Sequence, residues 1–153
     1  LTHDGFSIVV HERSETLSTL VHEEQSGWKG AQSVVEEIEA LGGNATVVRG
    51  DIRDRNTMEK MLSAATSLGN IAALVNNVGT PGEANLYMAH EVREDLWDET
   101  FDNNIKSVYQ LASVLVPEMA QSAATNKSII NFSSTAGKIF NCSFTHDWQI
   151  HSQ

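Results

Sequence analysis

The sequence predicts an α/β domain built on a doubly wound parallel sheet. Short apolar runs alternate along the chain with segments of helical periodicity, which is the order that crossover connections produce. The runs are apolar throughout, which indicates strands buried on both faces. With 153 residues, 41% hydrophobic and 20% charged, the chain has the length and composition of one ordinary domain with a packed core.

The first predicted strand is the apolar run 6–11, and the first predicted helix is 33–41. One face of that helix carries Val34, Val35, Ile38 and Leu41. Gly42 and Gly43 predict its end, because glycine adopts the left-handed turn that closes many helices. Residues 16–32 form an unusually long connection, for which we expect an insertion or an extra helical turn at 17–21.

The second predicted strand, 45–49, is also followed by a helix. Asn56 and Glu59 have the spacing of a capping box, with Asn56 as the cap and Glu59 reaching back to it. The inward positions of this helix are Met58, Met61, Leu62 and Ala65. We expect the helix to end at Gly69.

A third strand at 71–76 precedes a long predicted helix at 93–121, and a fourth strand follows at 128–132. The apolar stripe of the long helix is Trp97, Phe101, Ile105, Val108, Ala112, Leu115 and Met119. Pro117 predicts a kink or an early end in the last turns.

Charge and cysteine content exclude some classes of function. The formal charge of −10 repels a phosphate backbone, so we expect no nucleic-acid partner. No apolar run reaches the length of a membrane span, and no signal peptide opens the chain, so we expect no membrane partner. Cys142 is the single cysteine and excludes an internal disulfide. These features favour a cytoplasmic protein.

Polar residues follow each predicted strand, where open parallel sheets bind ligands. Glu12, Arg13 and Ser14 come after the first strand. A carboxylate at this place can accept from ribose hydroxyls, whereas an arginine and a hydroxyl can hold a 2′-phosphate. A solvated loop is the alternative. After the second strand, Asp51 and Ile52 can flank an adenine ring, although Gly-Asp is also common turn chemistry.

Asn77, Val78 and Gly79 follow the third strand and can shape the floor of a cofactor cleft, or form a plain turn. Asn104 is a polar residue beside the apolar stripe of the long helix, where a structural hydrogen bond is the simpler reading. Ser134 belongs to a hydroxyl-rich turn after the fourth strand, and can position a carbonyl group.

Taken together, these motifs resemble the short-chain dehydrogenase/reductase family from residue 1 to about residue 137, apart from 16–32. The family's Asn-Asn-Ala-Gly appears as Asn-Asn-Val-Gly at 76–79, and its Asp-Val appears as Asp51-Ile52. Its Trp-Asp…Asn helix appears as Trp97-Asp98…Asn104. Its strand ending in Ser-Ser-x-x-Gly appears at 129–137.

The resemblance implies a Rossmann-like domain over residues 1–140 and an NAD- or NADP-dependent oxidoreductase. Such an enzyme passes hydride between nicotinamide and a small-molecule carbonyl or alcohol substrate. By resemblance, Asn104 would hold a water of the proton relay and Ser134 would orient the substrate carbonyl. By the same resemblance, Asp51 and Ile52 would contact the adenine ring. The cofactor cleft would be lined by Asn77, Val78 and Gly79. The choice between NAD and NADP would depend on Glu12, Arg13 and Ser14.

The sequence departs from the family pattern at both ends. It contains no Gly-x-x-x-Gly-x-Gly turn, and residues 1–4 resemble the end of the helix that follows that turn. The family's catalytic Tyr and Lys would fall thirteen and seventeen residues after Ser134, where this chain has Asp147 and His151. Residues 141–153 do not resemble the family, and we interpret them as a divergent tail. We therefore expect an incomplete sheet without its first and last strands, and an inactive, marginally stable fragment.

Two alternatives remain for the function. The chain can be a nonenzymatic remnant that serves as a dimerisation or partner-binding module. Its contact surface would then be the helix at 93–121, because the corresponding helix commonly forms the dimer interface in the family. The resemblance also implies a homo-oligomeric parent enzyme. We expect no metal site, because His146, Asp147 and His151 have no further clustered ligands.

Overall fold

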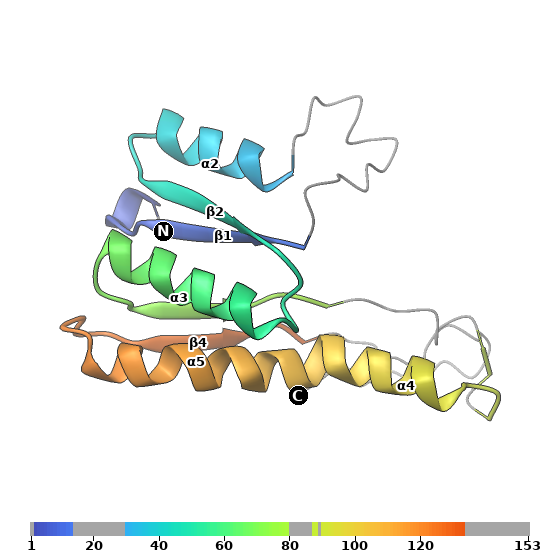
Figure 1. Cartoon of the computed structure of the whole chain (residues 1–153). Coiled ribbons are helices and arrows are strands. Elements are labelled where there is room, and N and C mark those ends of the chain that lie inside the picture. Colours follow the sequence, from blue (N-terminus) through green and yellow to red (C-terminus); the bar gives the residue numbers. More distant parts are fainter. Residues whose placement is uncertain (1, 14–29, 80–86, 89, 134–153) are drawn as a thin grey trace. The chain divides into compact units, whose positions relative to one another are not determined.

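The computed structural model describes residues 2–13, 30–79, 87–88 and 90–133 (Figure 1). The predicted helical turn at 17–21 and the tail at 141–153 lie outside these residues. The chain forms two compact units. Unit 1 comprises Leu1–Ile71 and Ser122–Ala124, and unit 2 comprises Ala72–Gln121 and Thr125–Gln153.

Unit 1 contains a two-stranded parallel sheet and two helices. Its elements are the short 3-10 turn η1 (Thr2–Asp4), β1 (Ile8–Glu12), α2 (Ala31–Ala40), β2 (Ala45–Arg49) and α3 (Arg55–Leu68). β1 and β2 pair from Ile8 opposite Ala45 to Glu12 opposite Arg49. The predicted strands, helices and parallel direction are thus confirmed in this half of the chain.

Helix α2 ends as the two glycines predict. Gly42 has a φ of +77°, and its N–H donates to the Glu39 carbonyl at 2.9 Å. The Gly43 N–H donates to the Ile38 carbonyl at 2.9 Å, which completes a Schellman motif. Leu41 was expected on the buried face and is 61% exposed, because it follows the last helical residue and the closing turn carries it into solvent.

Helix α3 is capped by Asp54, and the prediction of an Asn56–Glu59 capping box is wrong. The Asp54 carboxylate accepts from the backbone N–H of Asn56 at 3.1 Å. Glu59 pairs instead with Arg55 at 3.0 Å, one helical turn before it. The helix begins one residue before Asn56, so that Asn56 already lies in the first turn. The predicted end at Gly69 and the burial of Met58 are confirmed.

Unit 2 contains the second parallel strand pair and a long helical segment. Its elements are β3 (Ala73–Asn76), α4 (Glu94–Phe101), the π-helical turn η3 (Asp102–Lys106), α5 (Ser107–Gln121) and β4 (Ser128–Asn131). β3 and β4 pair from Ala73 opposite Ser128 to Asn76 opposite Asn131.

The expectation that helices cover both faces of the sheet is wrong for this strand pair. Val75 and Ile130 are register partners, so their side chains share a face of the sheet. They are 46% and 47% exposed, and all four residues of β4 are exposed. Val75 and Ile130 therefore leave their face of the β3–β4 pair open. On the other face Leu74 is buried, but its register partner Ile129 is 47% exposed.

The predicted helix at 93–121 is confirmed in its bounds, with α4, η3 and α5 following one another without a break (Figure 1). Pro117 lies inside α5, and the helix continues to Gln121. The predicted stripe is confirmed at Leu115 and Met119, which are buried. It is wrong at its start, since Trp97 is 38% exposed and stacks on Phe101 with ring centroids 4.9 Å apart.

Polar side chains occupy the buried face of the first half of this helix. The Thr100 hydroxyl donates to the Leu96 carbonyl at 2.9 Å, and the Ser107 hydroxyl donates to the Asn103 carbonyl at 2.6 Å. These bonds satisfy the buried hydroxyls within the helix itself. A pattern of apolar residues does not detect a buried face that is made of polar side chains. This explains why the predicted apolar stripe is wrong in the first half of the helix. No helix in the described part of the chain is long and apolar enough to cross a membrane.

Candidate functional site

The first group of candidate residues lies at the carboxyl ends of β1 and β2 in unit 1. Because the two strands are parallel and end in register, Glu12 and Arg13 lie beside the turn that carries Asp51. A guanidinium nitrogen of Arg13 is 3.8 Å from Asp51 Oδ2. The structure therefore brings together two of the residues that the sequence assigns to the adenosine part of a cofactor.

Asp51 is held ionised by its neighbours. Arg53 donates to it from its backbone N–H and from Nε, each at 2.9 Å to Oδ1, and from its terminal nitrogen to Oδ2. The side-chain hydrogen bond from Arg53 is the main cause that lowers the pKa of Asp51 to about 2, with partial burial acting against it and the charge of Arg13 adding to it. At neutral pH the carboxylate can only accept hydrogen bonds. The neighbouring Ile52 is buried.

The turn before Asp51 is fixed by contacts that the sequence analysis missed. The Gly50 N–H donates to the Glu12 carbonyl at 3.0 Å, and the Gly50 carbonyl accepts from His11 Nε2 at 2.8 Å. Gly50 has a φ of +146°, and a Cβ there would overlap the hydroxyl of the buried Thr57. Contacts with the end of β1 and with the first turn of α3 thus fix the turn that carries Asp51.

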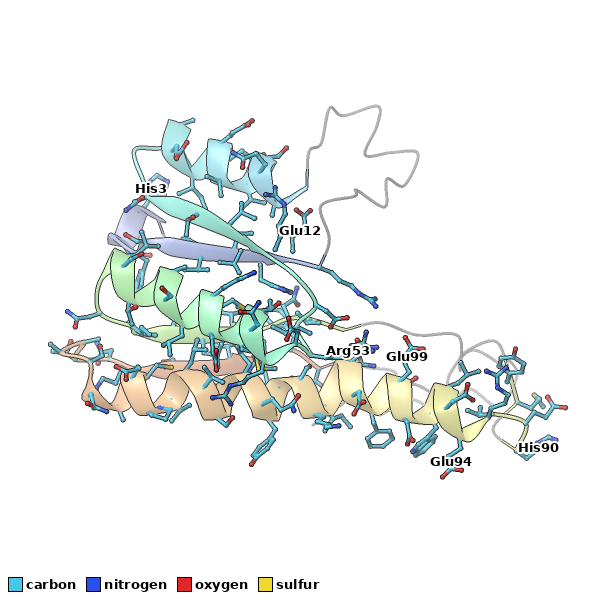
Figure 2. The ribbon with its side chains drawn as sticks, viewed as in Figure 1. His3, Glu12, Arg53, His90, Glu94 and Glu99 are labelled. Carbon is cyan, nitrogen blue, oxygen red and sulfur yellow. The ribbon has the colours of Figure 1, made fainter. Side chains whose placement is uncertain are left out.

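Glu12 is engaged inside unit 1. Its Oε1 accepts from the Ala31 N–H at the start of α2 at 3.1 Å, and its Oε2 accepts from Arg49 Nε at 3.1 Å. Figure 2 labels Glu12 close to that end of α2. The sequence assigns ribose recognition to this carboxylate, and that role stays a prediction.

The second group lies in unit 2, after β3. Asn76 is buried and its amide donates to Asn131 Oδ1 at 2.8 Å, which joins β3 to β4 at a register pair. Asn77, Val78 and Gly79 follow it and are exposed, Val78 to 44%. β3 thus ends at an amide pair that a hydrogen bond holds in place, and the next three residues are exposed to solvent.

Asn104 lies beside Gly79 in the same unit. A Cβ built at Gly79 would be 3.7 Å from Asn104 Oδ1, so the backbone at this glycine faces the amide directly. Asn104 is 7% exposed and belongs to the π-helical turn η3. Single π-helical turns are frequent at functional sites, because they displace side chains from the regular helical surface. Sequence motifs far apart in the chain meet here.

Two residues of the predicted site, Ser14 and Ser134, lie outside the described residues. Asp147 and His151, which stand where the family has its catalytic Tyr and Lys, lie outside them as well. Among the residues that the structure describes, no group of three His, Cys, Asp or Glu side chains is placed to hold a metal ion.

Comparisons with known proteins agree with the motifs. The sequence profile of the family described as short chain dehydrogenase matches residues 4–146. The chain belongs to this family. The 3-oxoacyl-[acyl-carrier-protein] reductase FabG of Staphylococcus aureus strain Mu50 is 31% identical over 138 residues, which are 90% of this chain and 54% of that protein. The short-chain dehydrogenase/reductase FrzI of Cladobotryum sp. is 34% identical over 109 residues, 71% of this chain and 40% of that protein.

Solved structures of short-chain dehydrogenases share the fold. A Brucella melitensis 3-oxoacyl-[acyl-carrier protein] reductase in complex with NAD superimposes with a TM-score of 0.74 at 20% identity, covering 98% of this chain and 54% of that one. A 7α-hydroxysteroid dehydrogenase complexed with NADH gives 0.66 at 26% identity, covering 88% and 46%. The Rossmann-like α/β fold is thus established. The chain spans about half the length of the curated relatives it matches.

Proposed function

We propose that this protein is an NAD(P)-dependent oxidoreductase that transfers hydride between nicotinamide and a small-molecule carbonyl or alcohol. The observation that carries the proposal is the ionised Asp51 at the carboxyl end of β2, 3.8 Å from Arg13. Open parallel sheets bind nucleotides at this edge. The proposal is supported by the relatives, which include a reductase solved with NAD and a dehydrogenase solved with NADH.

The residues of unit 1 fit an adenosine group. Asp51 offers a fixed, charged acceptor to an adenine amine, and its low pKa keeps it in this form at neutral pH. We assign the adenine contact to Asp51 and Ile52. We assign to Glu12, Arg13 and Ser14, which follow β1, the recognition of the ribose hydroxyls or of a 2′-phosphate.

The residues of unit 2 fit the nicotinamide half. A backbone surface that the flat nicotinamide ring can approach is formed by Asn77, Val78 and Gly79, the last of which has no side chain. The cofactor supplies the hydride chemistry when bound. Asn104 would hold a water molecule through its amide, and Ser134 would donate a hydrogen bond to the substrate carbonyl.

We also propose that the 153-residue chain alone does not turn over substrate. At the place of the family's catalytic tyrosine it has Asp147. A tyrosine keeps its proton until about pH 10, whereas an aspartic acid loses it near about pH 4, so an ordinary aspartate has no proton to donate at neutral pH.

Exposed aromatic and aliphatic groups favour a second candidate, a partner-binding module that uses the helix at 93–121. Trp97, Tyr109 and Val116 are 38%, 72% and 37% exposed. If this function holds, substitution of Tyr109 and Val116 by serine will abolish association with a second subunit in analytical ultracentrifugation.

Calorimetric titration with 5′-AMP tests the main proposal. We expect millimolar binding by the 153-residue chain, and an affinity lowered about tenfold in Asp51→Ala, because a charged hydrogen bond contributes about 1.5–3 kcal/mol. Asp95→Ala is the matched control, since Asp95 also pairs with an arginine two residues away, Arg93, but lies in unit 2. Absence of 5′-AMP binding, or equal losses in both variants, would refute the adenosine site.

A further inference from the structure

His11 donates a hydrogen bond from β1 to the backbone of the turn that follows β2. Its Nε2 lies 2.8 Å from the Gly50 carbonyl oxygen, and the contact is partly buried. A carbonyl oxygen can only accept, so the imidazole carries a proton on Nε2. His11 is the register partner of Val48, and Gly50 follows Val48 by two residues. A long side chain at position 11 therefore reaches the turn along one face of the strand pair.

The turn depends on such a contact because its first residue has to be glycine. Gly50 has a φ of +146°, and a Cβ there would overlap the hydroxyl of Thr57, which is 2% exposed. Glycine is also the residue that restricts its own backbone least. The peptide that joins Gly50 to Asp51 can therefore rotate more freely than a peptide that follows a larger residue.

Two groups of the Gly50–Asp51 peptide change direction together when it rotates. Because the peptide is planar and trans, its carbonyl and the Asp51 N–H point in opposite directions. A rotation of this peptide would reverse both groups and change the direction in which the Asp51 side chain leaves the backbone. It would also break the bond from His11, which needs the carbonyl in its present direction. The imidazole thus favours one orientation of the peptide.

The backbone contacts on either side of this peptide do not replace the His11 bond. Before it, the Gly50 N–H donates to the Glu12 carbonyl at 3.0 Å and continues the strand pairing. After it, the Asp54 N–H donates to the Asp51 carbonyl at 3.0 Å and ties Asp51 to the start of α3. His11 acts on the peptide between these two contacts, where glycine leaves the chain most free to rotate.

We propose that His11 is a positioning residue of the adenosine site, the group of residues at the carboxyl ends of β1 and β2. By holding the Gly50–Asp51 peptide, His11 keeps the Asp51 carboxylate in the orientation that accepts from an adenine amine. This inference rests on the proposed function and adds to it a residue that acts through the turn without touching the ligand.

Calorimetric titration of the 153-residue chain with 5′-AMP tests the proposal in three variants. His11→Phe keeps a ring but has no donor. His11→Gln has an amide N–H as many bonds from Cβ as Nε2 of the imidazole, whereas the N–H of His11→Asn is a bond short. We expect about fivefold weaker binding in His11→Phe and His11→Asn, the factor for one typical hydrogen bond that shifts the population of the competent orientation. His11→Gln should bind within about twofold of the wild type.

Gly42→Ala separates positioning from stability. It lies in the same unit, at the end of α2, and adds a Cβ at a φ of +77° without a steric contact. We expect this variant to lose stability in urea and to keep the wild-type affinity for 5′-AMP. If Gly42→Ala and His11→Phe lose affinity in proportion to their loss of stability, His11 only stabilises unit 1 and the inference is overturned.

The wild-type chain gives a second measurement that does not depend on a variant that folds. In ¹⁵N spectra of the imidazole ring we expect a proton on Nε2 of His11 that exchanges slowly with water, because it is held in a partly buried hydrogen bond. A ring that carries its proton only on Nδ1 overturns the inference.

The outcomes distinguish this inference from the proposed function. Unchanged 5′-AMP binding in folded His11→Phe, or equal affinities of His11→Gln and His11→Asn, overturns the role of His11 and leaves the adenosine site intact. Absence of 5′-AMP binding by the wild type overturns the proposed function and the inference together.

Discussion

Gly50 joins the end of β2 to Asp51 through a backbone conformation that other residues rarely adopt, with a φ of +146°. We predict that Gly50→Ala lowers the free energy of unfolding by about 2–3 kcal/mol, since it adds backbone strain and an overlap with Thr57. Gly42→Ala is the control: its φ is +77°, but a Cβ meets nothing within 4 Å, so we expect about 1 kcal/mol. Urea denaturation at low protein concentration measures both, and equal losses would contradict this account of the turn.

Asp51 links stability to pH. Its pKa is lowered from 3.8 to about 2 in the folded chain, chiefly by the Arg53 hydrogen bond. The stabilisation it provides is therefore complete above about pH 4 and is lost as the pH falls through about 2. Because the carboxylate is partly exposed, we expect about 1 kcal/mol. The difference in unfolding free energy between the wild type and Asp51→Asn should shrink by this amount from pH 5 to pH 2. A constant difference would show that the Arg53 pair is not formed in solution.

Residues of the candidate site differ in how far the sequence could predict them. Asp51, Gly79 and Asn104 belong to motifs whose order along the chain is itself a signal. His11 and Arg49 carry no such signal, because their partners, the Gly50 carbonyl and Glu12, are set by the register of β1 on β2. A side chain whose role depends on a neighbouring strand becomes visible only when the strands are paired.

At the scale of elements, the start of α3 offers a direct comparison of two candidate caps. Asp54→Ala removes the acceptor of the Asn56 N–H and should destabilise the chain by about 1 kcal/mol. Asn56→Ala keeps that backbone N–H and should change stability by less than about 0.5 kcal/mol. Thermal unfolding followed by helical circular dichroism measures both variants. A larger loss in Asn56→Ala would favour the capping box that the sequence suggested.

The long helix shows where periodicity fails. Its bounds were predictable, because apolar residues recur at spacings of three and four in the sequence from Trp97 to Met119. Its buried face was not, since Thr100, Asn103 and Ser107 are polar and use their hydrogen bonds on carbonyls of their own helix. The π-helical turn η3 also shifts the phase between the two halves. Hydrophobic patterns predict an element more reliably than they predict the face it buries.

At the scale of the whole molecule, the exposed face of the β3–β4 pair has a consequence for solubility. Val75 and Ile130 share this face and are almost half exposed. Exposed apolar strands promote association between chains. We predict that the 153-residue chain self-associates at high micromolar concentration, and that Val75→Thr/Ile130→Thr reduces this association while preserving the strands. Light scattering with circular dichroism measures both effects.

The control for this prediction is Tyr109→Ser/Val116→Ser on α5. If this helix variant abolishes association and the strand variant has no effect, the helix at 93–121 is the contact surface, as in the partner-binding alternative. The low stability expected from the sequence stays a prediction that thermal melting of the dilute chain can test.

The parallel direction of both strand pairs was predictable, because the buried strands alternate with helices along the chain. The division into two strand pairs agrees with the expectation of an incomplete sheet, since β1 pairs with β2 and β3 pairs with β4 among the described strands. The open face of β3–β4 was not predictable, because continuous apolar runs are typical of strands that are buried on both faces, whereas Val75 and Ile130 are almost half exposed in the structure.

The central claim is that the carboxyl ends of β1 and β2 in unit 1 bind the adenosine part of a nicotinamide dinucleotide. Titration of the ¹⁵N-labelled chain with NADP⁺, followed through its backbone amide signals, tests this claim most directly. We predict that the signals of Arg13 and of residues 51–53 shift. Shifts confined to other parts of the chain, or no shifts at millimolar NADP⁺, would contradict it.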